Sequence, residues 1–275
     1  MDAARIVAVV NQKGGVGKTT TLLNLGAYLS RLGRKVLLVD LDPQGNLTSG
    51  LGIRKDLVRV SSYDCLIRGV PVRHAALPTE LDRLDVVPAS VDLAGAEVEL
   101  VTADRRELRL REALEPVRAA YEVVLVDSPP SLGLLTVNAM AAADEVLIPI
   151  QCEFYALEGL SHLLRTIELI QRQLNPSLHI GGVILTMHDG RTNLSEQVAA
   201  DVRAHFGEVV FQTPIPRSVR LAEAPSHGKP IMLYDPHSRG AVAYEAVAIE
   251  FDSRLRHRAP EHELAAAGGQ AREGG

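Results

Sequence analysis

Tryptophan is absent from this 275-residue chain, and aromatic residues make up only 4% of it. A hydrophobic core must therefore be built from leucine, valine, isoleucine and alanine. Cysteine is scarce as well: Cys65 and Cys152 are far apart in the sequence and belong to no C-x-x-C motif. This spacing suggests neither a disulfide framework nor a zinc site, and we expect two free thiols in a reducing compartment.

Long apolar runs and an excess of basic residues are missing too. No window reaches about 18 uninterrupted apolar residues, so we expect no transmembrane helix. The opening residues, MDAARIVAVV, contain no signal-cleavage pattern, and we expect a cytoplasmic protein. The net charge of −5 argues against a protein that coats nucleic acid with its whole surface, but it leaves room for a local basic patch.

What the chain does contain is an alternation of short β-branched runs with longer amphipathic segments. The apolar runs predict buried strands at residues 5–10, 35–40, 122–127, 145–150 and 179–187. Apolar residues at three- and four-residue spacing predict helices at residues 18–32, 104–119, 132–142, 156–174, 193–205 and 239–255. This order predicts an α/β fold, with a mostly parallel twisted sheet and helices on both faces.

The rest of the chain is less regular. Residues 50–103 predict a smaller excursion of helices and loops, and Asp104 with Glu107 resembles a capping pair at a helix start. Residues 256–275 are rich in alanine, glycine and charge, so we expect a disordered tail. The length then predicts a single domain over residues 1–255.

A glycine-rich loop, NQKGGVGKTT at residues 11–20, joins the first predicted strand to the first predicted helix. Its glycines let the backbone approach a phosphate closely, and its N–H groups with the positive helix end form a nest for anions. The G-x-G-x-x-G spacing of dinucleotide-binding folds is absent, which favours a nucleoside triphosphate over NAD. We expect the ligand to be bound by Gly14, Gly15, Val16, Gly17, Lys18, Thr19 and Thr20.

Three side chains of this loop have distinct expected roles. Lys18 can reach the β- and γ-phosphates, and the Thr19 hydroxyl can ligate Mg²⁺. Thr20 adds a hydroxyl for the α-phosphate. The alternative, a turn that merely connects strand to helix, is disfavoured because all these features coincide in one place.

Aspartates follow two of the predicted strands. VLLVDLDPQGN contains Asp40 and Asp42, and VVLVDSPPSLG contains Asp127. The carboxyl ends of parallel strands lie beside the phosphate loop, where ligands bind in open α/β sheets. ATP hydrolysis needs one carboxylate to hold Mg²⁺ and one to position the attacking water.

The string KGGVGKTT resembles the deviant Walker A motif, K-G-G-x-G-K-[ST], of the ParA/MinD group of P-loop ATPases. EFYALEGL (153–160), TMHDGRTNLS (186–195) and IPRSVRLAEAPSHGKPI (215–231) resemble the ParA/Soj partition ATPases in particular. These motifs extend from residue 5 to about residue 250. The resemblance implies a P-loop NTPase with ATP and Mg²⁺ as ligands, and a nucleoid-associated homodimer that binds double-stranded DNA nonspecifically and is stimulated by a ParB-type partner.

The resemblance also implies roles at the nucleotide. Lys13 would reach across a dimer into the partner's nucleotide site and act in catalysis together with Lys18. Asp42 would orient the hydrolytic water and, with Thr19 and Asp127, lie at the metal. Asp40 stays open between a second magnesium-shell ligand and a structural carboxylate at a strand end.

Other residues match the family's adenine and DNA positions. Met187 and Pro216 fall where relatives enclose the adenine ring, although either could be core packing instead. Arg191, Arg217 and Arg220 resemble the DNA-contacting residues, with less support for Lys229. The alternative for the arginines is an ordinary solvated surface, or pairing with Asp189, Glu196 and Glu223.

Three other functions compete with this interpretation. A MinD-like membrane ATPase would need a terminal amphipathic helix, and RHRAPEHELAAAGGQAREGG has no bulky apolar face. An iron–sulfur reductase would need two well-placed cysteines in each subunit, and neither cysteine lies in the segments that carry the cluster in that family. A small-molecule P-loop kinase would need an acceptor site or lid that is not evident.

Overall fold

The structure is a computed structural model that describes residues 3–153 and 158–257. Within these residues seven strands form one sheet in the order β3-β4-β2-β5-β1-β6-β7. The strands are β1 Arg5–Val9, β2 Val36–Asp40, β3 Leu77–Pro78, β4 Leu84–Val87, β5 Val123–Asp127, β6 Glu145–Gln151 and β7 His179–Thr186. Neighbouring strands are parallel except β3 and β4, so the predicted α/β sheet is confirmed.

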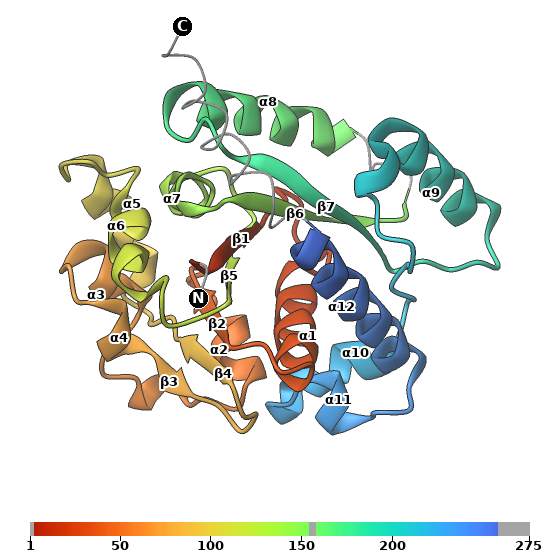
Figure 1. Cartoon of the computed structure of the whole chain (residues 1–275), viewed down its shortest axis with the longest axis horizontal. Helices are drawn as coiled ribbons and strands as arrows, with labels where there is room; N and C mark the ends of the chain where they lie inside the picture. The colour runs from red at the N-terminus through yellow and green to blue at the C-terminus, as the bar shows by residue number, and fades with distance from the viewer. Residues whose placement is uncertain (1–2, 154–157, 258–275) are drawn as a thin grey trace, which may run out of the picture.

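Helices cover both faces of the sheet (Figure 1). They are α1 Lys18–Arg31, α2 Asn46–Gly50, α3 Ser62–Ile67, α4 Val72–Ala75, α5 Leu93–Val101, α6 Arg109–Leu114, α7 Leu134–Ala142, α8 Glu158–Gln173, α9 Asn193–Phe206, α10 Val219–Glu223, α11 Ile231–Tyr234 and α12 Arg239–His257. Short 3₁₀ turns are η1 Lys55–Leu57, η2 Glu115–Val117, η3 Gly207–Val209 and η4 Ala224–His227.

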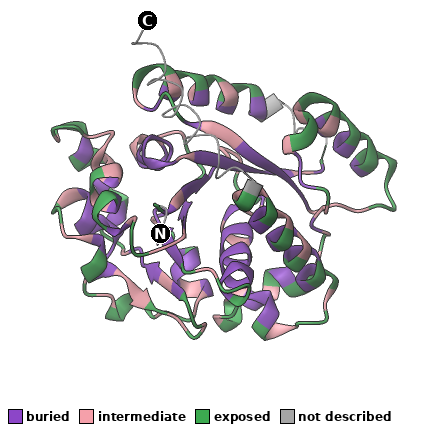
Figure 2. Ribbon diagram, in the orientation of Figure 1, coloured by how far each residue is buried: buried purple, intermediate pink, exposed green. Residues whose placement is uncertain are grey.

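Two apolar clusters separate the sheet from these helices. Alternate residues of β1 face opposite ways, so that Ile6 and Ala8 pack with α3–α9 while Val7 and Val9 pack with α1, α11 and α12. Figure 2 shows the central strands buried along their length. Burial on both faces explains why these strands are continuous apolar runs in the sequence.

The prediction for residues 50–103 was incomplete. This segment contains β4, which pairs in parallel with β2, and β3, which adds an antiparallel edge. The strand was missed because LDVV is short and includes Asp85, whose carboxylate accepts a hydrogen bond from the Tyr121 hydroxyl at 2.9 Å. A polar residue in a four-residue run removes the apolar signal.

The predicted helix at 104–119 was too long, and the capping pair was wrong. Arg105 has a φ of 49°, which interrupts a right-handed helix, and α6 begins only at Arg109. Glu107 pairs instead with Arg106 at 2.7 Å. The other predicted elements are present with small shifts at their ends. The predicted disordered tail, 256–275, began too early, because Arg256 and His257 still belong to α12. Its remainder from residue 258, and the predicted start of α8 at 156, lie outside the described residues.

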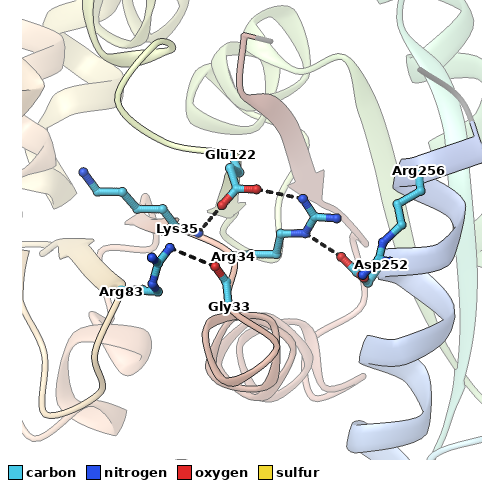
Figure 3. Close-up of polar contacts among 7 residues, drawn as sticks. All are labelled: Gly33, Arg34, Lys35, Arg83, Glu122, Asp252 and Arg256. Carbon is cyan, nitrogen blue, oxygen red and sulfur yellow. Dashed lines mark hydrogen bonds and ion pairs between the residues drawn. The ribbon is translucent and has the colours of Figure 1, made fainter. Parts of the chain in front are cut away.

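An ionic clamp joins α12 to the amino-terminal edge of the sheet (Figure 3). Gly33 ends α1 with a φ of 93°, as its position predicts, and turns the chain toward Arg34. The Arg34 guanidinium donates to Glu122 at 2.7 Å and to Asp252 of α12 at 2.6 Å. Both carboxylates favour the charged guanidinium and raise the pKa of Arg34. The clamp lies at the opposite edge from the glycine loop.

Candidate nucleotide-binding site

The glycine loop follows β1 and turns directly into α1. Gly15 and Gly17 have φ values of 75° and 89°, a left-handed conformation that other residues rarely adopt. A Cβ atom at Gly14 or Gly15 would meet no described residue within 4 Å, so space remains beside the loop at these two positions. No side chain in the described residues caps α1, and its first N–H groups and positive dipole end are therefore available to an anion.

A cavity of about 540 Å³ lies at this loop, in the size range of small-molecule sites. It brings together the loop, the segments after β2 and β5, and two segments from the second half of the chain. Its lining residues are Gly14, Gly15, Gly17, Lys18, Thr19, Thr20, Leu23, Asp42, Gln44, Asn46, Ser49, Pro130, Met187, Pro225 and Ser226.

Lys18 is buried at the floor of the cavity, with 7% of its surface exposed. Its ammonium group donates to the Lys13 carbonyl oxygen at 3.3 Å. Burial lowers the pKa of Lys18, and the charges of Asp127 and Asp42 oppose this shift. The buried ammonium group therefore lies where it can contact a ligand's phosphate oxygens.

Asp127 ends β5 and is fully buried. Its Oδ2 atom accepts a hydrogen bond from the Thr19 hydroxyl at 2.7 Å, whereas its Oδ1 atom has no hydrogen-bond partner among the described residues. Burial, and next the charge of Asp40, raise the pKa of Asp127 well above its usual range. A buried carboxylate oxygen without a donor, beside a hydroxyl, fits a hard cation such as Mg²⁺.

Asp40 differs because the protein occupies both of its oxygens. Oδ2 accepts from the Thr48 amide at 2.9 Å and hydroxyl at 2.6 Å, and Oδ1 accepts from the Asp42 amide at 3.2 Å. Burial raises the pKa of Asp40 to about 6. Of the two roles left open by the sequence, these contacts favour the structural one, in which Asp40 orders the loop from β2 to α2.

Asp42 lines the cavity, whereas Lys13 does not. Asp42 is buried and lines the cavity, where one carboxylate oxygen accepts from the Gln44 amide at 2.9 Å. The Lys13 side chain is 40% exposed and is not among the lining residues; its ammonium group lies 3.9 Å from Glu153. Lys13 therefore does not line the cavity of its own subunit, and its ammonium group lies near Glu153 instead.

Comparisons with known proteins agree with this geometry. A family model described as "AAA domain" matches residues 4–180. The sporulation initiation inhibitor protein Soj of Bacillus subtilis is 57% identical over 246 residues, 90% of this chain and 97% of Soj. The chromosome partitioning protein ParA of Caulobacter vibrioides is 57% identical over 256 residues, 92% of this chain and 96% of ParA. The chain belongs to the ParA/Soj family of partition ATPases.

A solved structure extends the similarity to three dimensions. A protein named cobyrinic acid a,c-diamide synthase from Mycobacterium smegmatis, bound to ADP and magnesium, superposes with a TM-score of 0.79 at 42% identity. The match covers 92% of this ParA/Soj chain and 95% of the other. The two proteins share the P-loop ATPase fold.

The structure separates the two residues expected at the adenine. Met187 lines the 540 Å³ cavity and has a φ of 52°, an uncommon backbone conformation for methionine. Pro216 lines a second cavity instead. Pro225 and Ser226 of η4 lie at the first cavity and were not predicted, because no local pattern indicates that η4 folds back against α2.

The second cavity, of about 890 Å³, groups two of the three arginines expected at DNA in ParA/Soj proteins. Arg191 and Arg217 line it, and so does Arg239 at the start of α12, which was not predicted. Arg220 lies elsewhere and pairs with Glu223 at 3.1 Å. Lys229 is exposed and is not among the lining residues either.

Acidic neighbours already contact these arginines. Arg191 donates to both carboxylate oxygens of Asp189 at 2.8 Å, although its side chain is 89% exposed. The guanidinium holds the pKa of Asp189 well below its usual range. Ion pairing and DNA binding are compatible here, because exposed ion pairs are weak enough for phosphates to displace.

Three further observations bear on the competing functions. None of the described helices is long and apolar enough to cross a membrane. Cys65 and Cys152 are both buried, so neither thiol is presented at the surface of the subunit. Within the described residues no group of three or more histidine, cysteine or acidic side chains forms a metal site; a magnesium ion held by one or two side chains, phosphates and water needs no such group.

Proposed function

We propose that this chain is an ATP-dependent DNA-partitioning ATPase that binds ATP with Mg²⁺ in the 540 Å³ cavity. The observation that carries the proposal is the buried Oδ1 atom of Asp127, which has no hydrogen-bond partner among the described residues and lies in the same side chain that contacts Thr19 of the glycine loop. Relatives named as chromosome partitioning proteins, from Caulobacter vibrioides and Myxococcus xanthus, support the biological role. In this proposal residues 1–255 act as a single domain.

Residues of the glycine loop and the two aspartates have separate roles in binding and hydrolysing ATP. The N–H groups of residues 14–20 and the Lys18 ammonium group bind the phosphates of ATP. Thr19 and Asp127, with Asp42 nearby, would hold Mg²⁺, which neutralises charge on the phosphate oxygens when bound. Asp42 accepts a hydrogen bond from the attacking water and orients it toward the γ-phosphorus, and the products are ADP and phosphate.

Two subunits then pair around their nucleotides. Because the Lys13 side chain is 40% exposed and does not line its own cavity, it can add positive charge to the triphosphate held by a second copy. The paired subunits present Arg191, Arg217, Arg220 and Arg239 twice to the phosphates of nonspecific double-stranded DNA. Doubling the contacts should roughly double the slope of log affinity against log salt. The protein would associate with the nucleoid, and a ParB-type partner would stimulate hydrolysis.

The test is duplex DNA binding without nucleotide, with ADP and with ATP–Mg²⁺, each across a salt series. We expect binding only with ATP–Mg²⁺ and a steep loss of affinity with salt. DNA binding in no nucleotide state would contradict the proposal. The same samples would then be sedimented with anionic liposomes, where ATP-dependent binding would support the MinD-like alternative.

A further inference from the structure

One carboxylate lies between the lysine of the glycine loop and an arginine of the second cavity. Glu153, just after β6, is 3.9 Å from the Lys13 ammonium group and 3.7 Å from the Arg217 guanidinium. Each cation contacts a different oxygen of the same side chain. Among the described residues, no other carboxylate lies within 4.0 Å of either cation.

The backbone holds these three residues in place from three separate segments. The Asn11 side chain accepts from the Lys13 amide at 2.9 Å, and the Glu153 amide donates to the Gln151 carbonyl oxygen at 2.8 Å. The Arg217 amide donates to the His188 carbonyl oxygen at 3.1 Å. The shared carboxylate is therefore a product of the folded subunit and not of local sequence.

We propose that Glu153 is an intramolecular counter-ion that restrains both Lys13 and Arg217 in the free subunit. The inference rests on the proposed function, in which Lys13 turns to a partner's ATP and Arg217 turns to DNA. Each event has to break one contact with Glu153. Glu153 therefore opposes premature pairing and nucleotide-independent DNA binding, and acts as a positioning residue without touching ATP.

The contacts are exposed, so their strength is limited. The side chains of Lys13, Glu153 and Arg217 are 40%, 48% and 69% exposed. Exposed ion pairs of this kind shift an equilibrium by about 1.4- to 5-fold each. A dimer breaks two equivalent contacts, which gives an effect of about 2- to 25-fold on pairing. A restraint of this size can be overcome by ATP and DNA.

The test compares Glu153→Gln with wild type and with Glu168→Gln. The second variant makes the same charge change on α8, where Glu168 contacts Arg172 at 3.8 Å. One measurement is the protein concentration at half-dimerisation with a non-hydrolysable ATP analogue and Mg²⁺, by sedimentation. The other is duplex DNA affinity at fixed ionic strength, with and without the analogue. We expect E153Q to dimerise at about 2- to 25-fold lower concentration and to bind DNA more tightly, and E168Q to match wild type.

A double-variant cycle separates a specific contact from a general change in charge. In an Arg217→Ala background, E153Q should still favour dimerisation. At protein concentrations where every variant is fully dimeric with the analogue, however, E153Q should no longer tighten DNA binding in that background. E153Q that matches E168Q in both measurements, or that weakens dimerisation, would overturn the inference alone. A wild-type protein that neither pairs nor binds DNA with the analogue would overturn the proposed function and this inference with it.

Discussion

The three aspartates at the carboxyl edge of the sheet differ in how many of their oxygens the protein occupies. Both oxygens of Asp40 accept protein hydrogen bonds, whereas one oxygen of Asp127 has no partner among the described residues. Burial of a charge without a partner costs free energy. That cost is tolerated at Asp127 because a bound cation would remove it.

Replacing Asp127 by asparagine tests this residue. We expect D127N to lose the thermal stabilisation that ATP–Mg²⁺ gives wild type, and to hydrolyse ATP about 100-fold more slowly or worse. Without nucleotide its melting temperature should not fall, since the variant removes a buried charge. Asp56→Asn, at an exposed pair with Arg54, is the control and should behave like wild type. A D127N protein stabilised normally by ATP–Mg²⁺ would contradict the assignment.

The two cysteines give a prediction about pH and reactivity. Burial raises the pKa of Cys65 to about 12 and that of Cys152 to about 11. Because the thiolate is the reactive form, labelling by a disulfide reagent at pH 8 should be slower than for a free cysteine, by about 1000-fold at Cys65 and about 100-fold at Cys152. Both thiols should be labelled rapidly in denaturant. Rapid labelling of the native protein would contradict the prediction, because it would show that a thiol is accessible. Cys152→Ser identifies which signal is which.

At the scale of elements, η4 is held against the loop that follows α2. The two backbones touch at glycines: a Cβ atom on Gly228 would lie 2.6 Å from the Gly52 Cα atom. Next to this contact, Pro225 and Ser226 line the nucleotide cavity. The contact therefore connects the folding of the C-terminal segment to the wall of the site.

A Gly228→Ala variant should disturb both stability and binding. Its φ of 65° strains any L-residue, and the added Cβ would also overlap Gly52, so we expect a loss of about 2–4 kcal/mol in unfolding free energy. Gly69→Ala is a matched control, because Gly69 has a φ of 67° and nothing within 4 Å of a Cβ. It should lose only about 1 kcal/mol. Urea unfolding and ATP affinity of both variants check this, and equal losses would show that the contact is unimportant.

At the scale of the whole molecule, the ionic clamp and the site occupy opposite edges of the sheet. Arg34, just after α1, contacts Glu122 just before β5 and Asp252 of α12. The other end of α12 begins at Arg239, which lines the second cavity. The Asp252 side chain is only 7% exposed, so this pair is better shielded than the surface pairs. The clamp should therefore contribute to global stability without touching the nucleotide.

Replacing Arg34 by methionine tests the clamp. We expect a loss of about 1–3 kcal/mol in unfolding free energy by urea titration, since hydrogen bonds to charged groups are removed from a partly buried position. The affinity of the folded variant for ATP should be unchanged. Arg54→Met removes a pair with both side chains more than 60% exposed and should lose less than about 1 kcal/mol. Losses of similar size in the two variants would contradict the role of the clamp.

The sequence by itself determined the features that depend on neighbours along the chain. The continuous apolar runs predicted five of the strands. The sequence also predicted that the glycine loop joins β1 to α1 and that Asp127 lies at the end of a strand. The short strand β4 escaped because Asp85 interrupts its pattern. These successes and the failure have one cause: strands, turns and helix starts are encoded over a few residues.

Only the tertiary structure decided which side chains share a site. Strand order and crossovers bring together residues that are far apart in the sequence. As a result Met187 lines the 540 Å³ cavity with Pro225, whereas Pro216 lines the second cavity with the arginines. Within the described part of the chain, the same long-range packing left one Asp127 oxygen without a donor and placed Glu153 between Lys13 and Arg217. Spacing along the chain carries no information on these contacts, because they are made by elements that meet only when the sheet has formed.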